Sequence, residues 1–290
     1  MDSNQRCNAS NNRSPRALAL GTALKAARLD GEFGLREFAK EIGRDPSVLS
    51  RWESGERAPL PTEAAQILGK LGVTGKLYDQ IIKLAYGLDD PMWLATSLPE
   101  QRAQLNALLD FERMTSQITE VSPLLVPGLL QTSDYARAIM VRADVPADEI
   151  STRVATRMGR REVLKKSGPF RFTALIGEAA LRQQIGNARI TAEQMGFLLE
   201  MAQHPNVDIR VLPFDSDWHP GLEGPVLLIG AENETSVVHL EVRGSGLFLH
   251  APHDVSAYRA AVAKVTKQAI SAEDSEVVIA LAKTAWEHEA

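Results

Sequence analysis

A short window of the sequence carries hydroxyl and guanidinium groups at a spacing suited to reading DNA. Within residues 35–59, Ser47, Ser50, Arg51 and Ser54 recur at three- and four-residue intervals, so they share one face of an expected short helix. That face carries no Asp or Glu. An arginine can grip guanine through two hydrogen bonds, and a serine can contact base edges or phosphates. The chemistry expected here is recognition of a DNA groove.

The neighbouring residues predict two short helices and a tight turn that would position this face. An apolar stripe defines the first helix: Leu35, Phe38, Ala39 and Ile42. Gly43 permits the sharp turn, Asp45 is suited to cap the second helix, and Pro46 occupies its first position, where a missing N–H costs nothing. Val48, Leu49 and Trp52 would face the core, which leaves the polar face outward.

Two further cations lie close to this face. Lys40 and Arg44 precede the expected second helix and could hold the domain on phosphates. A second interpretation stays open, in which residues 35–59 form a helical hairpin of an unrelated bundle with a merely solvated face.

The run from Asp45 to Pro59, which contains S-x-x-S-R-W-E-S-G-E-R-x-P, resembles the recognition helix and following turn of Xre-family (Cro/C1-type) regulators. The resemblance covers about residues 17–75 and implies base contacts by Pro46, Ser47, Ser50 and Arg51. The sequence departs from the phage repressors at Pro46, where a glutamine is common. Because proline cannot hydrogen-bond a base, Ser47 and Arg51 must carry more of the readout, or an apolar contact with thymine replaces it.

The chain of 290 residues is long enough for about two domains. We expect a mainly α plus α+β protein, in which a five-helix Cro/C1-type domain is followed by a larger mixed α+β domain. Glycine, proline and polar clusters suggest the boundaries. These boundaries divide the chain into four regions: a disordered tail over 1–15, the helix-turn-helix domain over 16–87, a linker and the start of a connecting helix over 88–104, and a regulatory or partner-binding domain over 105–290.

The charge is distributed unevenly between these regions. The whole chain has a net charge of −5, but residues 1–75 hold 11 Lys and Arg against 9 Asp and Glu. The acidic excess therefore belongs to the second region. Since the first region is only mildly basic, any DNA affinity must come from placed side chains rather than bulk charge.

The sequence favours a cytoplasmic protein. Cys7 is the single cysteine, which excludes an internal disulfide and suits a reducing compartment. The first fifteen residues are rich in Asn and Ser and lack an apolar stretch, so we expect no secretory signal. No segment has the apolar length that would cross a bilayer.

The second region alternates helical and strand patterns. Four helices are expected over about 100–117, about 148–166, 254–270 and 272–288. Another should begin after a cap at Thr132 or Ser133, and a further one should run from a capping box at Thr191 to Gln203. Strands are expected over 170–176, 207–212, 225–229 and 237–242.

This region resembles the C-terminal domain of actinobacterial WhiJ-like regulators in three separated motifs, over 123–136, 177–182 and 204–214. That likeness implies a partner more than a reaction, because such regulators are often encoded beside a small protein similar to BldB. The pair resembles an antitoxin–toxin-like module.

A candidate partner or ligand site lies in the first of these motifs and on a later helix. Its residues are Pro127, Gly128, Gln131, Thr132, Tyr135, Arg157 and Arg161. Pro127-Gly128 suits a type II turn, and the alternative is a purely structural turn and helix cap. The later helix also carries a basic ridge, formed by Arg153, Arg157, Arg161 and Lys165 with Arg160 and Lys166 beside them. This ridge could touch DNA or an acidic partner, and the alternative is a solvated helix face.

Catalysis and metal binding are not expected. No nucleophile elbow, phosphate-binding glycine loop or zinc-protease motif is present, so no cofactor is predicted. His250 and His253 lack an accompanying Cys, and Pro252 disfavours a helix that could align them. Glu178 and Arg182 are best explained as an ion pair one helical turn apart. The segment around Asp215, Asp217, His219 and Glu223 could form a lid over a ligand, although a plain exposed loop explains it equally.

Three functions remain as hypotheses. The first is a sequence-specific repressor or autoregulator that binds a two-fold DNA site as a dimer and is controlled by its second domain through a small protein or a small-molecule effector. The second is an antitoxin-like protein that neutralises a small partner, with DNA binding as autoregulation. The third, an enzyme with an attached DNA-binding module, would need groups such as Glu178, His219 and His250 to converge.

Overall fold

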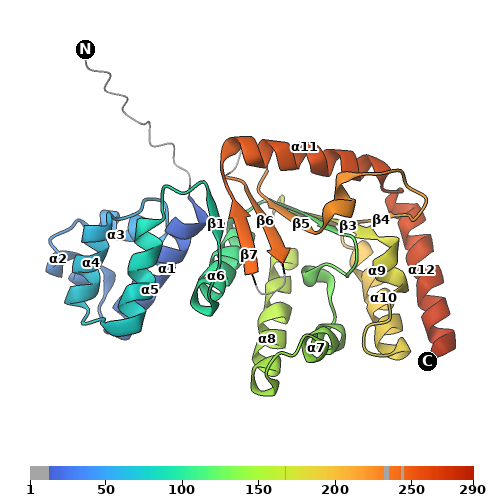
Figure 1. Ribbon diagram of the computed structural model, residues 1–290, viewed down its shortest axis with the longest axis horizontal. Helices are drawn as coiled ribbons and strands as arrows, with labels where there is room; N and C mark the ends of the chain where they lie inside the picture. The colour runs from blue at the N-terminus through green and yellow to red at the C-terminus, as the bar shows by residue number, and fades with distance from the viewer. Residues whose placement is uncertain (1–12, 167, 232–234, 243–244) are drawn as a thin grey trace, which may run out of the picture. The chain divides into compact units, whose positions relative to one another are not determined.

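The computed structural model describes residues 13–166, 168–231, 235–242 and 245–290 (Figure 1). The chain forms two compact units. The first runs to Phe111 and also takes in Val242–Ala251, and the second comprises Glu112–Glu241 and Pro252–Ala290. Most of the disordered tail expected over 1–15 lies outside the described residues.

Five helices build the N-terminal part of the first unit, as the sequence predicts. They are α1 (Pro15–Asp30), α2 (Leu35–Glu41), α3 (Pro46–Glu53), α4 (Pro61–Lys70) and α5 (Gly75–Tyr86). Their shared core contains the buried side chains of Leu20, Leu24, Phe38, Leu49, Trp52 and Leu68. Proline starts α1, α3 and α4, where its fixed φ suits the first turn and no hydrogen bond is lost.

The first unit also contains a pair of strands and a long helix. Strand β1 (Met92–Leu94) pairs antiparallel with β7 (Ser245–Leu249), a segment about 150 residues further along the chain, and α6 (Leu98–Met114) follows β1. Gln104 of α6 donates hydrogen bonds to the carbonyls of Trp93 (2.6 Å) and Gly246 (3.1 Å), so one amide links both strands. Neither strand was predicted, because runs this short carry little alternation.

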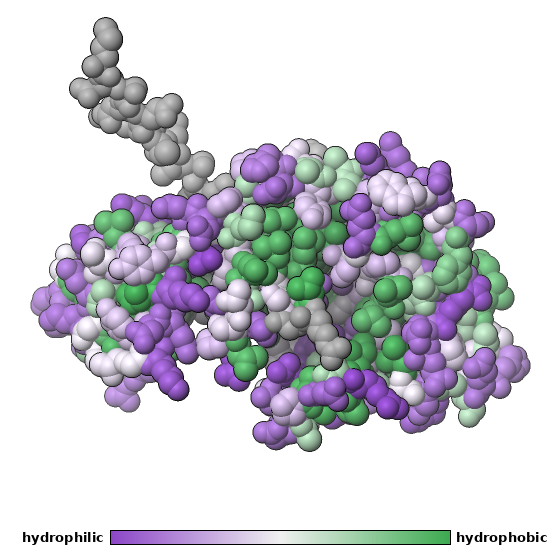
Figure 2. Space-filling model, viewed as in Figure 1, coloured by the Kyte–Doolittle hydropathy of each residue, from purple (hydrophilic) through white to green (hydrophobic). Residues whose placement is uncertain are grey.

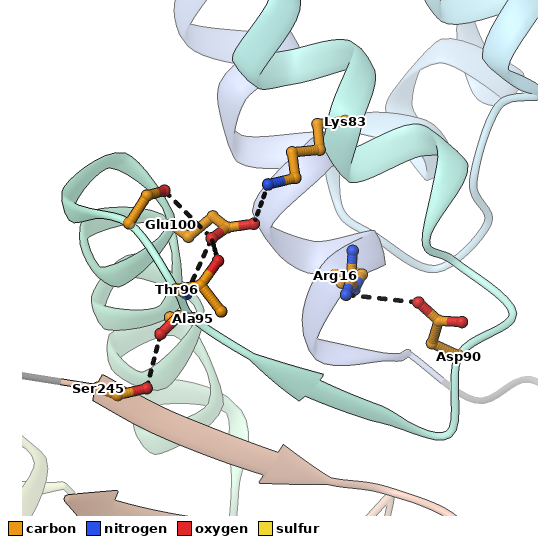
Figure 3. Close-up of polar contacts among 8 residues, drawn as sticks. Arg16, Lys83, Asp90, Ala95, Thr96, Glu100 and Ser245 are labelled. Carbon is orange, nitrogen blue, oxygen red and sulfur yellow. Dashed lines mark hydrogen bonds and ion pairs between the residues drawn. The ribbon is translucent and has the colours of Figure 1, made fainter.

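Polar contacts bind these added elements to the five helices (Figure 3). Glu100 at the start of α6 forms an ion pair with Lys83 of α5 (2.9 Å) and accepts hydrogen bonds from Thr96 and Ser97. Burial disfavours the charged form of Glu100, but these hydrogen bonds outweigh it and lower its pKa to about 2. Arg16 of α1 reaches Asp90 at 3.4 Å. The segment after α5 is therefore held against its own domain.

The second unit is a mixed α+β structure, which confirms the expected fold class. Its five described strands are β2 (Gln117–Ser122), β3 (Arg171–Gly177), β4 (Val207–Leu212), β5 (Val226–Ile229) and β6 (Val237–Val242). They lie in the order β6-β5-β2-β3-β4. Strands β2, β3 and β4 run parallel, whereas β5 is antiparallel to both β2 and β6.

Helices complete the second unit (Figure 1). They are α7 (Ser133–Arg142), α8 (Ala147–Arg160), α9 (Glu178–Arg182), α10 (Ala188–Ala202), α11 (Pro252–Gln268) and α12 (Ala272–Glu289), with short 3-10 helices η1 (Gly128–Leu130), η2 (Arg161–Lys165) and η3 (Pro220–Glu223). Helices α10 and α12 pack on each other and on β4. Among the described helices, none combines the length and apolar character needed to cross a membrane.

Several expected boundaries in this unit were wrong. The helix expected to reach Gln117 ends at Met114, and Gln117 instead begins β2. The helix expected over 148–166 ends at Arg160, where the chain tightens into η2 and buries Val163 and Leu164.

The local turn and cap assignments also need correction. Helix α10 begins before Thr191, because Asn187 caps it by accepting from the N–H of Ile190. Thr191 is therefore an interior residue. Gly128 does not have the positive φ of a type II turn; it begins η1 instead.

Candidate nucleic-acid interface

The turn between α2 and α3 has the geometry that its residues predict. Gly43 adopts a left-handed conformation (φ 63°), which glycine tolerates without strain. Asp45 then caps α3, since its carboxylate accepts a hydrogen bond from the N–H of Ser47 (2.7 Å). The hydrogen bonds from Ser47 stabilise the ionised cap and lower the pKa of Asp45.

Helix α3 separates a buried face from a polar face, as expected. Leu49 and Trp52 are buried, with exposed fractions of 1% and 3%. Ser47, Ser50 and Arg51 are exposed, whereas Pro46 and Ser54 are half-buried. The Nε of Arg51 donates to the carbonyl of Ser47 (3.2 Å), and its Nη2 lies 3.4 Å from the Ser47 hydroxyl. The guanidinium thus lies along the outward face beside the hydroxyl groups.

The two cations proposed for phosphate contact differ in their surroundings. Lys40 is exposed in the last turn of α2. Arg44 instead bonds to Glu63 of α4 (2.8 Å), and its guanidinium lies 5.8 Å from the ring centre of Trp52. Because the Arg44 side chain is still 44% exposed, this ion pair contributes little stability and does not prevent Arg44 from reaching a phosphate.

A buried ion pair fixes the C-terminal end of α3 against α1. Arg28 donates to both carboxylate oxygens of Glu53, at 2.7 and 2.8 Å, and to the carbonyl of Phe33 at 2.6 Å. Both side chains are almost completely buried. The hydrogen bond with Glu53 raises the pKa of Arg28 and outweighs the effect of burial. Sequence reasoning missed this pair, because the two residues are 25 positions apart.

Glycine permits the close approach of α1 and α3. A Cβ atom on Gly21 would collide with the backbone carbonyls of Trp52 and Glu53. Gly55, directly after α3, has φ 67°, and a Cβ there would lie 2.7 Å from the Cα of Leu18. These contacts leave α3 little freedom to move. Figure 2 shows a largely hydrophilic outer surface over α2 and α4, which adjoin it in this unit.

The fold and these placements define a helix-turn-helix DNA-binding domain followed by a mixed α+β domain. Residues 24–76 match the helix-turn-helix family HTH_3, and residues 105–280 match the family described as a domain of unknown function (DUF5753). The chain belongs to the DUF5753 family. Its N-terminal domain supports a DNA-binding transcriptional regulator of the Xre type. No curated protein and no solved structure matches the chain significantly. Its likeness to WhiJ-like regulators stays a prediction.

The structure brings part of the candidate partner or ligand site together. Gln131 accepts a hydrogen bond from Nη1 of Arg157 (2.8 Å) and donates to the carbonyl of Val126. The N–H of Gly128 faces a carboxylate oxygen of Glu120 (3.4 Å). Glu120 was not predicted, although its place in a strand pattern beside the Pro127-Gly128 motif could have indicated it.

The remaining candidates of that site are structural or lie elsewhere. Tyr135 is fully buried, Thr132 caps α7, and Pro127 precedes η1. Burial raises the pKa of Tyr135 to about 12. Arg161 diverges from Arg157, because its guanidinium lies over the ring of Phe197 (4.8 Å).

The basic ridge expected along residues 153–166 is not a continuous solvated face. Arg153 and Lys165 are exposed, but Arg157 and Arg161 are half-buried. Arg160 is also half-buried and forms a two-point ion pair with the buried Glu112 (2.6 and 3.1 Å). Lys166 donates to the carbonyls of Glu112 and Thr115. These contacts turn the cations toward the protein.

The other titratable candidates do not form one group within a unit. Glu178 forms the expected ion pair with Arg182. His219 is buried in the second unit, where burial lowers its pKa, whereas His250 belongs to the first unit. Across the described ranges, no group of three or more His, Cys, Asp or Glu side chains could hold a metal ion.

Proposed function

We propose that the outward face of α3 reads base edges in the major groove, with Arg51 as the main specificity contact and Ser47 and Ser50 beside it. Lys40 and Arg44 would bind phosphates. The single observation that carries this proposal is the combination of a rigidly held helix and an exposed guanidinium on its free face. A fixed helix limits the entropy lost when Arg51 engages a base.

The protein would act as a repressor or autoregulator at the nucleoid, without catalysis. One such domain reads only a few base pairs, so we expect a homodimer on a two-fold site with half-sites one helical turn apart, about 10 base pairs. Selection from random duplex DNA with the full chain tests this. A two-fold consensus with that spacing is expected, and enrichment of no sequence over repeated rounds would contradict the proposal.

We also propose that the second unit controls DNA binding. The path of the chain supports this view, because Val242–Ala251 leaves the second unit, forms β7 in the first unit and then returns. Changes in the second unit therefore have a covalent route to the strand that pairs with β1. A full chain whose DNA affinity is unchanged by every bound partner or effector would contradict this control.

A second candidate function is antitoxin-like binding of a small partner protein, in which DNA binding serves autoregulation. The loop between β4 and β5 supports it, since Phe214, Trp218 and Leu222 are 64%, 64% and 61% exposed. Apolar side chains gathered in one exposed loop are typical of interaction surfaces. Mixing the full chain with the purified product of an adjacent small gene tests this function. A stable complex that Trp218→Ser abolishes is expected, and no complex would contradict it.

A further inference from the structure

One group of charged side chains in the second unit lies at one face of the sheet, and ion pairs neutralise only some of its charges. Glu120 of β2 is paired with Leu227 of β5, and Leu227 is paired with His239 of β6. Residues opposite each other on neighbouring strands point to the same face. Glu120, Leu227 and His239 therefore form one row, and Glu241, two residues after His239, lies on the same face.

Helix α8 supplies the cations of this group. Arg160 is neutralised by its two-point ion pair with Glu112. Arg157, one turn earlier, forms a hydrogen bond only with the neutral amide of Gln131, and it forms no ion pair with any described residue. Burial and the neighbouring Arg160 lower the pKa of Arg157, while Glu241 and Glu120 oppose that shift. Arg157 is therefore a half-buried cation without a bonded carboxylate.

Glu120 is the matching acidic group without a bonded cation. Its Oε1 accepts one long hydrogen bond from Gly128, and its Oε2 is fully enclosed with no hydrogen-bond partner among the described residues. Burial raises the pKa of Glu120 to about 7 despite the nearby charge of Arg160, and Glu112 and Glu241 add to the rise. Burial also lowers the pKa of His239 to about 4, so its imidazole is neutral at pH 7.

We propose that Glu120 and Arg157 form the two ends of a binding site for a small zwitterion of the amino-acid class. The ammonium group of the ligand would bind Glu120, and its carboxylate would bind Arg157. Leu227 would lie under the ligand, and His239 would face its far end.

The balance of charges selects a zwitterion over simpler ions. Because Arg160 and Glu112 neutralise each other, a purely anionic ligand would leave Glu120 without a cation, and a purely cationic one would leave Arg157 without an anion. A molecule with one charge of each sign satisfies both uncompensated groups without adding net charge to a partly buried site, where unpaired charge is costly. Enclosed, unpaired polar atoms are uncommon in folded proteins, and the ammonium group of a ligand would supply the hydrogen bond that Oε2 of Glu120 lacks.

The position of the site suggests how it would act, and this step rests on the proposed function. Strand β6 carries His239 and Glu241, and the chain runs from β6 into β7, which pairs with β1 in the DNA-binding unit. A ligand that orders β6 would be coupled through this connection to DNA affinity, so the second unit would act as an effector sensor.

The binding test uses the full chain and each of the common L-amino acids as probes, by thermal shift and titration calorimetry. We expect at least one to bind with a Kd between about 1 μM and 1 mM. Glu120→Gln and Arg157→Gln should each weaken binding at least about tenfold. Arg153→Gln removes an exposed arginine of the same helix and should bind as the parent does. If no amino acid binds at about 10 mM, or if both site variants bind normally, the site is refuted.

Two measurements on the unaltered protein do not depend on how the variants fold. The N-acetyl and the amide derivatives of the ligand lack its positive and negative charge, and both should bind at least about tenfold more weakly. Because burial raises the pKa of Glu120 to about 7, binding of an ammonium group at neutral pH should release part of a proton, seen as a dependence of the binding heat on the buffer. Undiminished binding of either derivative, or no proton release, refutes the assigned ligand orientation.

The regulatory step is tested separately. The ligand should change the affinity of the full chain for its selected DNA site by about fivefold or more. Ligand binding without any change in DNA affinity overturns the coupling alone. Absence of sequence-specific DNA binding by the unliganded and the liganded protein overturns the proposed function, while the ligand site stands.

Discussion

Replacing Glu53 by alanine should unfold the helix-turn-helix domain locally, although Glu53 itself touches no DNA. The substitution leaves Arg28 buried, at 5% exposure, without the carboxylate that accepts two of its hydrogen bonds. Removing one partner of a buried ion pair typically costs about 3–5 kcal/mol. A domain is stable by only about 5–15 kcal/mol, so this loss is a large part of the total.

The matched control is Asp90→Ala, in the same unit. Asp90 also pairs with an arginine, Arg16, at 3.4 Å, but its side chain is 59% exposed. Exposed pairs are worth about 0–1 kcal/mol, so this variant should differ little from the parent. The double substitution Arg28→Met with Glu53→Leu removes both buried charges and should recover most of the lost stability.

Hydrogen exchange resolved by peptide is the suitable assay, because it reports on each unit separately. Peptides from α1 and α3 should exchange about 150- to 4,000-fold faster in Glu53→Ala, the factor that corresponds to a loss of about 3–5 kcal/mol. Peptides from β3 serve as the internal reference. If Glu53→Ala costs no more than Asp90→Ala, the buried pair does not hold α3 in place, and the argument for a rigid reading helix fails.

Three further predictions follow from the same unit. Gly21→Ala should destabilise it by about 1–3 kcal/mol in thermal unfolding, because the new Cβ meets backbone carbonyls. Gly69→Ala, in the exposed last turn of α4, should be neutral or slightly stabilising, because nothing lies near the new Cβ. Equal effects of the two substitutions would contradict the close packing of α1 against α3. The folded pKa of Glu100 lies below its ordinary 4.5, so its contribution to stability is present above pH 4.5 and is lost as the pH falls toward 2. Glu100→Gln should therefore flatten the pH dependence of unfolding in that window, and an unchanged profile would refute the ion pair with Lys83. Lys40→Ala should weaken binding to specific and random DNA alike and lower the salt slope by about 1, and a loss confined to the specific site would reassign Lys40 to base readout.

The sequence predicts what depends on local chemistry. Gly43, Asp45 and Pro46 are neighbours whose backbone preferences fix the turn and the start of α3, and the apolar spacing around Leu49 and Trp52 decides which face is buried. The expected polar face and the five helices are therefore found where the pattern placed them.

The features that were missed depend on contacts between distant residues. Strand β7 pairs with β1 only because a segment from late in the chain joins the first unit. The spacing of Arg157 and Arg161 suggested a solvated ridge, but the carboxylate that draws Arg160 inward, Glu112, is 48 residues away. Charge spacing along a helix does not reveal which side chains find buried partners elsewhere.

The most direct test of the central claim compares Arg51→Ala with the parent protein on the selected DNA site and on random DNA of equal length. Lys76→Ala, which removes an exposed cation from α5, is the control for lost charge. Arg51→Ala should reduce the ratio of specific to random affinity by about 5- to 150-fold, as for one lost bidentate contact worth about 1–3 kcal/mol, with unchanged thermal unfolding. If Arg51→Ala keeps the full ratio, α3 does not read DNA through this guanidinium, and the account is wrong.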